Sequence, residues 1–126
     1  MSEASAKLTT FPAFIKVSGK RALVVGNGEE ALAKCRLLAE TDVGVLLAAD
    51  APSPELLAYA EKSGIEHVCS AFSADLVKNT VLAFGATGDA ALDRAVVDAA
   101  RAAGVLGNAV DQPDYCDFYT PALVSR

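Results

Sequence analysis

A chain of 126 residues has the length of one domain, and 52% hydrophobic residues suffice for a buried core. Its net charge of −5 argues against nucleic acid and against an anionic membrane as the main partner. No apolar run approaches the length of a membrane span, and residues 1–10 lack the apolar core of a signal peptide. Three scattered cysteines form no metal-binding spacing, so we expect a cytoplasmic domain with no fixed metal site.

Strand-like and helix-like segments alternate along the chain after a polar, flexible lead-in at residues 1–10. A short extended piece at residues 11–17 and a Ser-Gly-Lys turn come before the first strand. Strands are expected at residues 21–26, 43–50, 65–70, 80–87 and 105–110. Helices are expected from near residue 29, at residues 53–64 and 88–104, with a single helical turn at 73–79. A loop at 111–117 and an extended segment at 118–124 complete the series.

Helix boundaries carry recognisable end signals. Ser53 is a typical cap, Pro54 suits the first helical position, and Gly64 and Gly104 are typical stops. The first helix repeats small and apolar residues at helical spacing. The face predicted to be buried consists of Ala31, Leu32, Cys35, Leu38 and Ala39.

The alternation of strands and helices predicts the fold class. Parallel strands require crossover connections, and these are right-handed, so the outcome is an open α/β sheet with helices on both faces. We therefore expect a Rossmann-like, doubly wound, mainly parallel five-stranded sheet over residues 11–126. A short extra extended segment is expected at its N-terminal end.

A glycine-rich turn follows the first strand. Gly26, Gly28 and Ala31 form a Gly-x-Gly-x-x-Ala version of the dinucleotide fingerprint. In this pattern Gly26 permits the turn, Gly28 lets the backbone approach a pyrophosphate, and Ala31 lets the helix pack closely on the sheet. Asn27 completes the turn. The alternative is a plain glycine turn between a strand and a helix.

The helix after this turn would direct free N–H groups and its positive dipole end at the phosphates. Glu29 and Glu30 lie in its first turn, where the same dipole favours carboxylates. Both residues border the predicted cofactor site. Stabilisation of the helix is their simplest role.

An acid at the end of the second strand is expected to bind a ribose hydroxyl of the cofactor. Asp50 lies about twenty residues beyond the glycines, with Ala49 and Ala51 on either side. Because a carboxylate there repels a 2′-phosphate, Asp50 favours NAD over NADP. Asp50 is equally well explained as a solvated loop acid before Pro52, and both interpretations stay open.

Further polar residues follow the later strands. Ligands bind at the carboxyl ends of the strands in an open α/β sheet. Thr87 and Gly88 follow the fourth strand, while Asn108 and Asp111 lie at the end of the fifth. The strand ends therefore bring these residues together with the glycine-rich turn. By residue pattern alone, Asp111 is best explained as a turn acid before Gln112-Pro113.

Four segments carry a family resemblance, at residues 11–38, 53–60, 86–104 and 107–126. The most distinctive features are the Phe11-Pro12 opening, Thr87 at a strand end, and the Asn-x-Val-Asp-x-Pro pattern from Asn108 to Pro113. With these segments the chain resembles the N-terminal domain of siroheme synthase, of the precorrin-2 dehydrogenase and sirohydrochlorin ferrochelatase family.

The resemblance implies an NAD-dependent enzyme that oxidises precorrin-2 to sirohydrochlorin. Bifunctional members of the family also insert ferrous iron, and the full-length protein is expected to be a homodimer. The reaction requires a base, which the resemblance assigns to Asp111; the same carboxylate could take pyrrole protons as iron enters. Asn108 could orient the nicotinamide or simply close the strand end.

Departures from the family pattern occur at several positions. Asn27 interrupts a run of three glycines, Ala33 replaces an arginine, Gly88 replaces an acid and Ser125 replaces an aspartate. Family members also continue past the equivalent of Arg126 into a dimerisation region and a helical domain, which are absent from this sequence. We therefore expect a cofactor domain that is weakly active in isolation.

The charge distribution supports the same expectation. The family's tetrapyrrole substrate is rich in carboxylates, whereas this chain is acidic overall. The sequence places Lys16, Lys20 and Arg21 at the start of the first strand, which is the wrong end of the sheet for the substrate. Arg126 is then the well-placed cation.

Two other functions compete with the enzyme: a non-catalytic nucleotide sensor, and a degenerate domain that keeps only the fold. An acid at Asp111 is needed by the enzyme and not by a sensor.

Overall fold

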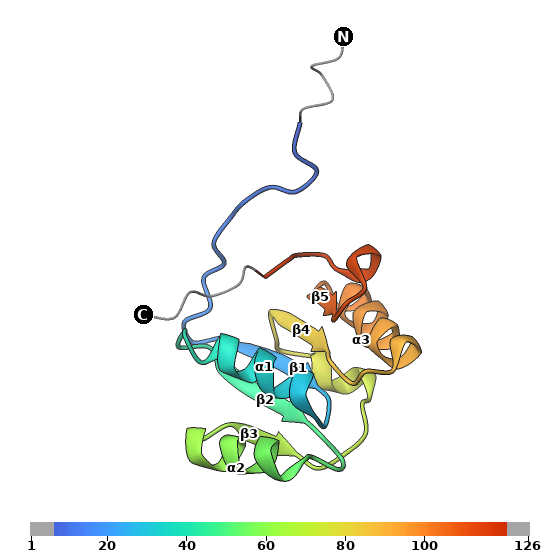
Figure 1. Cartoon of the computed structure of the whole chain (residues 1–126). Coiled ribbons are helices and arrows are strands. Elements are labelled where there is room, and N and C mark those ends of the chain that lie inside the picture. Colours follow the sequence, from blue (N-terminus) through green and yellow to red (C-terminus); the bar gives the residue numbers. More distant parts are fainter. Residues whose placement is uncertain (1–6, 121–126) are drawn as a thin grey trace.

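Five strands form one sheet in which every neighbouring pair is parallel. The computed structural model describes residues 7–120 (Figure 1). The strand order is β3-β2-β1-β4-β5, with β1 at the centre. The strands are β1 (Arg21–Val25), β2 (Gly44–Ala48), β3 (Glu66–Val68), β4 (Leu82–Gly85) and β5 (Leu106–Ala109). The expected parallel five-stranded α/β fold is confirmed.

Helices cover both faces of the sheet. The α-helices are α1 (Glu29–Leu38), α2 (Pro54–Ser63) and α3 (Ala90–Ala102), and the short 3-10 helices are η2 (Ala74–Val77) and η3 (Pro113–Tyr115). Leu32 and Leu56 join α1 and α2 to one apolar layer, whereas Val96 joins α3 to the layer on the opposite face. Alternate residues of β1 serve the two layers, because successive strand side chains point to opposite faces. The sheet is therefore doubly wound, as expected.

The predicted helix ends are confirmed by the local geometry. The hydroxyl of Ser53 accepts a hydrogen bond from the backbone N–H of Leu56 at 3.2 Å, and Pro54 is the first residue of α2. Gly64 ends α2 with φ 69°, a left-handed conformation that glycine adopts without strain. Gly104, with φ 75°, follows the end of α3.

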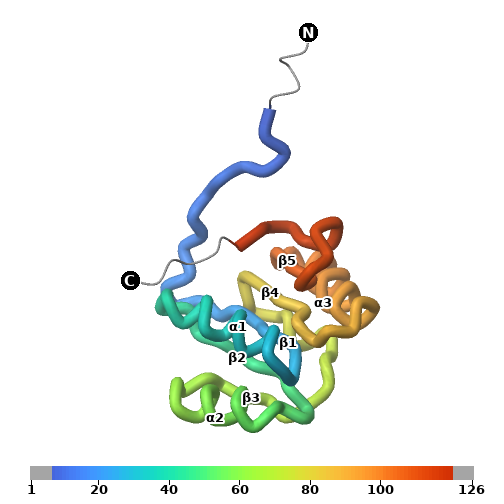
Figure 2. Tube along the Cα trace, in the orientation of Figure 1, coloured from blue at the N-terminus to red at the C-terminus, as the bar shows by residue number. Residues whose placement is uncertain are grey.

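One local expectation differs from the structure, and two others can be stated more closely. Ala39, expected on the buried face of the first helix, is exposed, because α1 ends at Leu38 and Ala39 is its C-cap. The single helical turn expected at residues 73–79 is present as the 3-10 helix η2. The extended segment expected at residues 11–17 joins no strand of the sheet, and the chain before β1 extends away from the rest of the domain (Figure 2).

The sheet order creates one topological switch point. The chain moves outward from β1 to β2 and β3, and then returns across the sheet to β4 and β5. The loops after β1 and β4 therefore separate from one another at the carboxyl edge of the sheet. Such a crevice is the usual ligand site of an open α/β sheet.

In the described part of the chain, no helix combines the length and apolarity needed to cross a membrane.

Candidate cofactor and catalytic site

A cavity of about 240 Å³ lies at the switch point. It brings together the loops after β1, β2 and β4, and also the segment after β3. Four predicted site residues and their neighbours line it: Val25, Gly26, Asn27, Ala48, Asp50, Ser70, Ala71, Phe72, Thr87 and Leu92. The structure therefore places the glycine-rich turn, the β2 acid and the β4 threonine around one space.

Gly26 and Gly28 differ in what surrounds them. A Cβ on Gly26 would lie 2.1 Å from the carbonyl oxygen of Ala86, and the backbone of Gly26 has φ 157°. Its Cβ would also lie 3.0 Å from the Cβ of buried Ala31, so Gly26 permits close packing of α1 on the sheet. A Cβ on Gly28 would meet no heavy atom within 4 Å. The bare backbone at Gly28 is thus unused by the protein's own packing and leaves room for a ligand.

Asn27 joins the loop after β1 to the loop after β2. Its side-chain Nδ2 donates to Oδ1 of Asp50 at 2.9 Å, and its Oδ1 accepts from the backbone N–H of Ala51 at 3.1 Å. Its backbone carbonyl accepts from the N–H of Ser53 at 2.7 Å. These three bonds fix the position of the Asp50 carboxylate at the cavity. The residue that interrupts the family's glycine run therefore has a structural role in this chain.

The loop that carries Asp50 is also held from the β3 side. Ala49 is buried, and its N–H donates to the carbonyl of Val68 at 3.0 Å. The carbonyl of Ala49 is 2.9 Å from Nε2 of His67, and the Cys69 thiol donates to the carbonyl of Asp50 at 3.6 Å. The lone histidine of the chain thus supports the backbone of this loop.

Thr87 is tied to the start of α3 through a buried acid. The hydroxyl and the N–H of Thr87 both donate to Oδ1 of Asp93, at 2.7 and 2.9 Å. Asp93 is only 2% exposed, so these bonds compensate for burial of its carboxylate. Gly88 follows with φ 86°, a left-handed conformation that suits glycine. The β4 loop is therefore a rigid wall of the cavity.

A second cavity, of about 200 Å³, lies at the end of β5. Asp111 lines it in a left-handed conformation with φ 64°, which aspartate tolerates better than most residues. Lys34 of α1 also lines this cavity; its Nζ donates to the Thr120 hydroxyl at 3.4 Å and lies 5.7 Å from the Phe84 ring centre. The cavity therefore combines one carboxylate and one cation.

Asn108 lies under this second cavity and is 5% exposed. Its Nδ2 donates to the backbone carbonyl of Phe118 at 2.9 Å, and its backbone forms an antiparallel bridge with Cys116. This amide closes the end of β5, the second of the two roles expected for Asn108. An orienting role toward a nicotinamide stays a prediction.

Glu29 and Glu30 begin α1 and face different surroundings. Glu29 is exposed. Burial raises the pKa of the Glu30 carboxyl, and the nearby carboxyl group of Asp111 raises this pKa further. Oε1 of Glu30 lies 3.8 Å from the position that a Cβ on Gly88 would occupy. Glu30 therefore lies between the β4 loop and Asp111.

Comparison with known proteins connects this geometry to a sequence family. Residues 13–122 match the family described as putative NAD(P)-binding. The chain belongs to this family.

The relatives of this NAD(P)-binding chain include siroheme synthases, as the sequence resemblance predicted. The enzyme of Chromobacterium violaceum is 38% identical over 116 residues, which cover 92% of this chain and 25% of the relative. The enzyme of Nitrosomonas europaea is also 38% identical over 116 residues, covering 91% of this chain and 24% of the relative. The chain thus spans about a quarter of the length of these relatives.

The fold also resembles that of a solved structure, SirC, precorrin-2 dehydrogenase. The TM-score is 0.61, with 20% sequence identity over 69% of this chain and 44% of that chain. At this identity the likeness concerns the fold, which agrees with the doubly wound sheet expected of an NAD(P)-binding domain.

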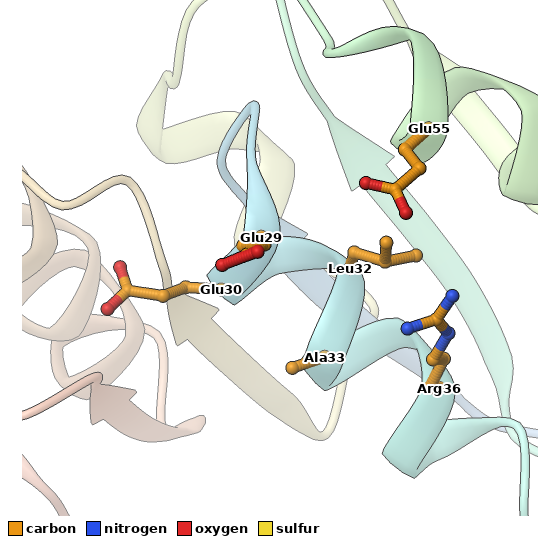
Figure 3. A pocket seen from close by; sticks show the side chains of 6 residues that line it. All are labelled: Glu29, Glu30, Leu32, Ala33, Arg36 and Glu55. Atoms are coloured by element: carbon orange, nitrogen blue, oxygen red, sulfur yellow. The ribbon is translucent and has the colours of Figure 1, made fainter.

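Figure 3 shows another hollow of this NAD(P)-binding domain, about 380 Å³ in volume and lying between α1 and α2. It is larger than either strand-end cavity, but it lies on helix surfaces and outside the switch point. Leu32, Ala33, Arg36 and Glu55 line it together with the two glutamates. Figure 3 also shows that the Glu30 carboxylate points away from this hollow, toward the part of the chain that holds α3 and β5.

The cations predicted from the sequence do not gather at the site. Arg21 pairs with Glu66 at 2.9 Å, at the amino ends of the strands as expected. Arg126 lies outside the described residues. The sequence analysis missed Lys34, although its position one helical turn after Glu30 could have indicated a shared helix face. Between residues 7 and 120, no group of three or more His, Cys, Asp or Glu side chains could hold a metal ion.

Proposed function

We propose that the chain is the NAD-binding domain of a precorrin-2 dehydrogenase, which oxidises precorrin-2 to sirohydrochlorin. The observation that carries this proposal is the bare backbone of Gly28 at the start of α1, next to the cavity that contains Asp50. The names of the similar proteins, siroheme synthase and precorrin-2 dehydrogenase, supply the reaction.

The residues of the first cavity fit a dinucleotide. Gly28 and the N–H groups at the start of α1 would hold the pyrophosphate, and Asp50 would accept hydrogen bonds from the adenosine ribose. Asn27 holds one oxygen of Asp50 and fixes its orientation. No lysine or arginine lines this cavity, so a 2′-phosphate would meet a carboxylate without a compensating cation, and NAD is the proposed form. The bound nicotinamide supplies the hydride acceptor.

The residues of the second cavity fit proton transfer from the substrate and binding of one of its carboxylates. Asp111 accepts the proton that the substrate loses, and a positioned carboxylate base typically contributes about 10²–10⁴-fold. Lys34 lines the same cavity and gives a substrate carboxylate a cationic partner. Iron insertion is a further proposal: ferrous iron would be a substrate there, and Asp111 would accept pyrrole protons.

A further proposal concerns the location of the protein in the cell. We place it in the cytoplasm, where its free cysteines suit a reducing environment.

We also propose that the protein forms a homodimer. Exposed Phe11 and Phe14, together with an apolar groove of about 370 Å³ beside Phe84 and Phe118, support an interface on this side of the domain.

Substitution of Asp111 tests the proposed reaction. With the protein in excess over precorrin-2 and NAD saturating, a single turnover is followed by absorbance of the reduced cofactor. Asp111→Asn keeps the shape of the side chain and removes the base, so we expect the rate to fall by about 100-fold or more with NAD affinity nearly unchanged. A near-normal rate in the variant would make Asp111 a turn residue. NAD binding without turnover in either protein would instead favour the nucleotide sensor.

A further inference from the structure

Strand pairing brings Asn27 next to Asp50. In the parallel register of the two central strands, Val25 of β1 pairs with Ala48 of β2. Two residues beyond this pair the chains reach Asn27 and Asp50, and both residues line the first cavity. Asn27 also comes directly before Gly28 in the sequence. One residue therefore connects the proposed pyrophosphate position with the proposed ribose position.

The Asn27 side chain uses both of its polar atoms on the loop that carries Asp50. Its Nδ2 donates to Oδ1 of the Asp50 carboxylate at 2.9 Å, while its Oδ1 accepts from the N–H of Ala51 at 3.1 Å. Asp50 itself is exposed, and among the described residues no other side chain bonds its carboxylate. Without Asn27, this carboxylate would therefore be free to turn among its staggered rotamers.

We propose that Asn27 determines the preference for NAD over NADP, because it prevents the Asp50 carboxylate from turning away from a 2′-phosphate. This inference rests on the proposed function, in which Asp50 meets the adenosine ribose. A carboxylate accepts about four hydrogen bonds, and Asn27 uses one, so ribose hydroxyls can still donate to Asp50. An ionised 2′-phosphate has no proton to donate there. It meets a fixed negative charge in a cavity that no lysine or arginine lines.

A mobile acid at this position would discriminate less between the two cofactors. The repulsion between two charges weakens as they separate, and water and salt screen the remainder at an exposed site. An unclamped Asp50 could turn its charge into solvent when NADP binds, whereas the hydrogen bonds of an NAD ribose need the carboxylate in place. Loss of the Asn27 side chain should therefore weaken NAD binding slightly and relieve the repulsion of NADP.

Calorimetric titration with NAD and with NADP tests this role in four forms of the 126-residue chain: the wild type, Asn27→Ala, Asp50→Asn and the double variant. We expect the ratio of the two affinities to fall from about ten-fold or more in the wild type to about three-fold or less in Asn27→Ala. Asp50→Asn should remove the preference. Adding Asn27→Ala to it should then have no further effect on the ratio, because the clamp no longer holds a charge.

An unchanged ratio in folded Asn27→Ala, or independent effects in the double variant, would overturn the role of Asn27 and leave Asp50 as the ribose partner. Asn27→Gly, which gives three consecutive glycines, replaces Asn27→Ala if that variant does not fold, with the same expected ratio.

Ser53→Ala distinguishes the clamp from general support of the loop. The Ser53 hydroxyl caps α2 through the N–H of Leu56 at 3.2 Å, and Ser53 does not line the cavity. We expect this variant to unfold at a lower temperature with the ratio of NAD to NADP affinity unchanged. If Ser53→Ala narrows the ratio as much as Asn27→Ala does, loop stability sets the preference and the proposal is wrong. A wild-type preference that survives Asp50→Asn would instead refute Asp50 as the ribose partner, and the role of Asn27 with it.

Discussion

Asn27 and Gly28 are adjacent residues with separate roles. Asn27 provides three hydrogen bonds that lock the loop after β2, including the 2.9 Å bond to Asp50. Gly28 contributes only the absence of a side chain, and no protein atom occupies the space that a Cβ would take. The sequence predicted both glycine positions, because the fingerprint is local. It did not predict the Asn27 clamp, because the clamp depends on two loops that are distant in sequence and meet only when β1 and β2 pair.

Two glycine substitutions should distinguish a loss of cofactor binding from a loss of folding stability. Gly28→Val places a side chain where the pyrophosphate must approach, so we expect NAD binding to be lost while the unfolding temperature stays near that of the wild type. Gly26→Ala is the matched control: its Cβ would clash with the carbonyl of Ala86 at 2.1 Å. It should lower the free energy of unfolding by roughly 2 kcal/mol or more.

Calorimetric binding and thermal unfolding measure the two effects. Normal NAD affinity in folded Gly28→Val would exclude Gly28 from the phosphate site. An unchanged stability in Gly26→Ala would show that the turn after β1 is not closely packed against β4.

At the scale of elements, α3 is fixed to the sheet by a polar contact within an apolar face. Asp93 occupies a buried position one turn before Val96 and Val97, and its carboxylate accepts two hydrogen bonds from Thr87. The helix itself was predictable, because its apolar periodicity and its end at Gly104 are local signals. Asp93 was not predicted, since an acid on an apolar helix face reveals its partner only after β4 and α3 are packed together.

Removal of the Asp93 carboxylate should weaken the junction between β4 and α3. In Asp93→Ala, the N–H and hydroxyl of Thr87 lose their acceptor, so we expect the free energy of unfolding to fall by about 1–3 kcal/mol. Asp98→Ala on the exposed side of the same helix is the control, with an expected change within about 0.5 kcal/mol. Chemical denaturation measures both. Equal losses in the two variants would mean that helix propensity, and not the Thr87 contact, dominates.

At the scale of the whole molecule, the strand pattern in the sequence predicted the fold and the edge of the sheet where the site residues meet. It did not predict how the site divides into cavities. The alternating pattern predicted five parallel strands, and parallel pairing then brought the predicted residues to one edge of the sheet. The division into two cavities, with Asp50 in one and Asp111 in the other, was not predicted. The turn that leads into α1 lines the first cavity, and Lys34 of α1 lines the second. This division depends on three-dimensional packing.

Calorimetric titration of the 126-residue chain with NAD and then with NADP tests the central claim most directly. The account predicts saturable binding of one NAD per chain, about ten-fold or more tighter than NADP, because Asp50, the proposed ribose partner, lines a cavity whose lining contains no lysine or arginine. Asp50→Asn should reduce that preference. Equal affinities, or tighter binding of NADP, would remove Asp50 from the ribose role, and a folded chain that binds neither nucleotide would contradict the account as a whole.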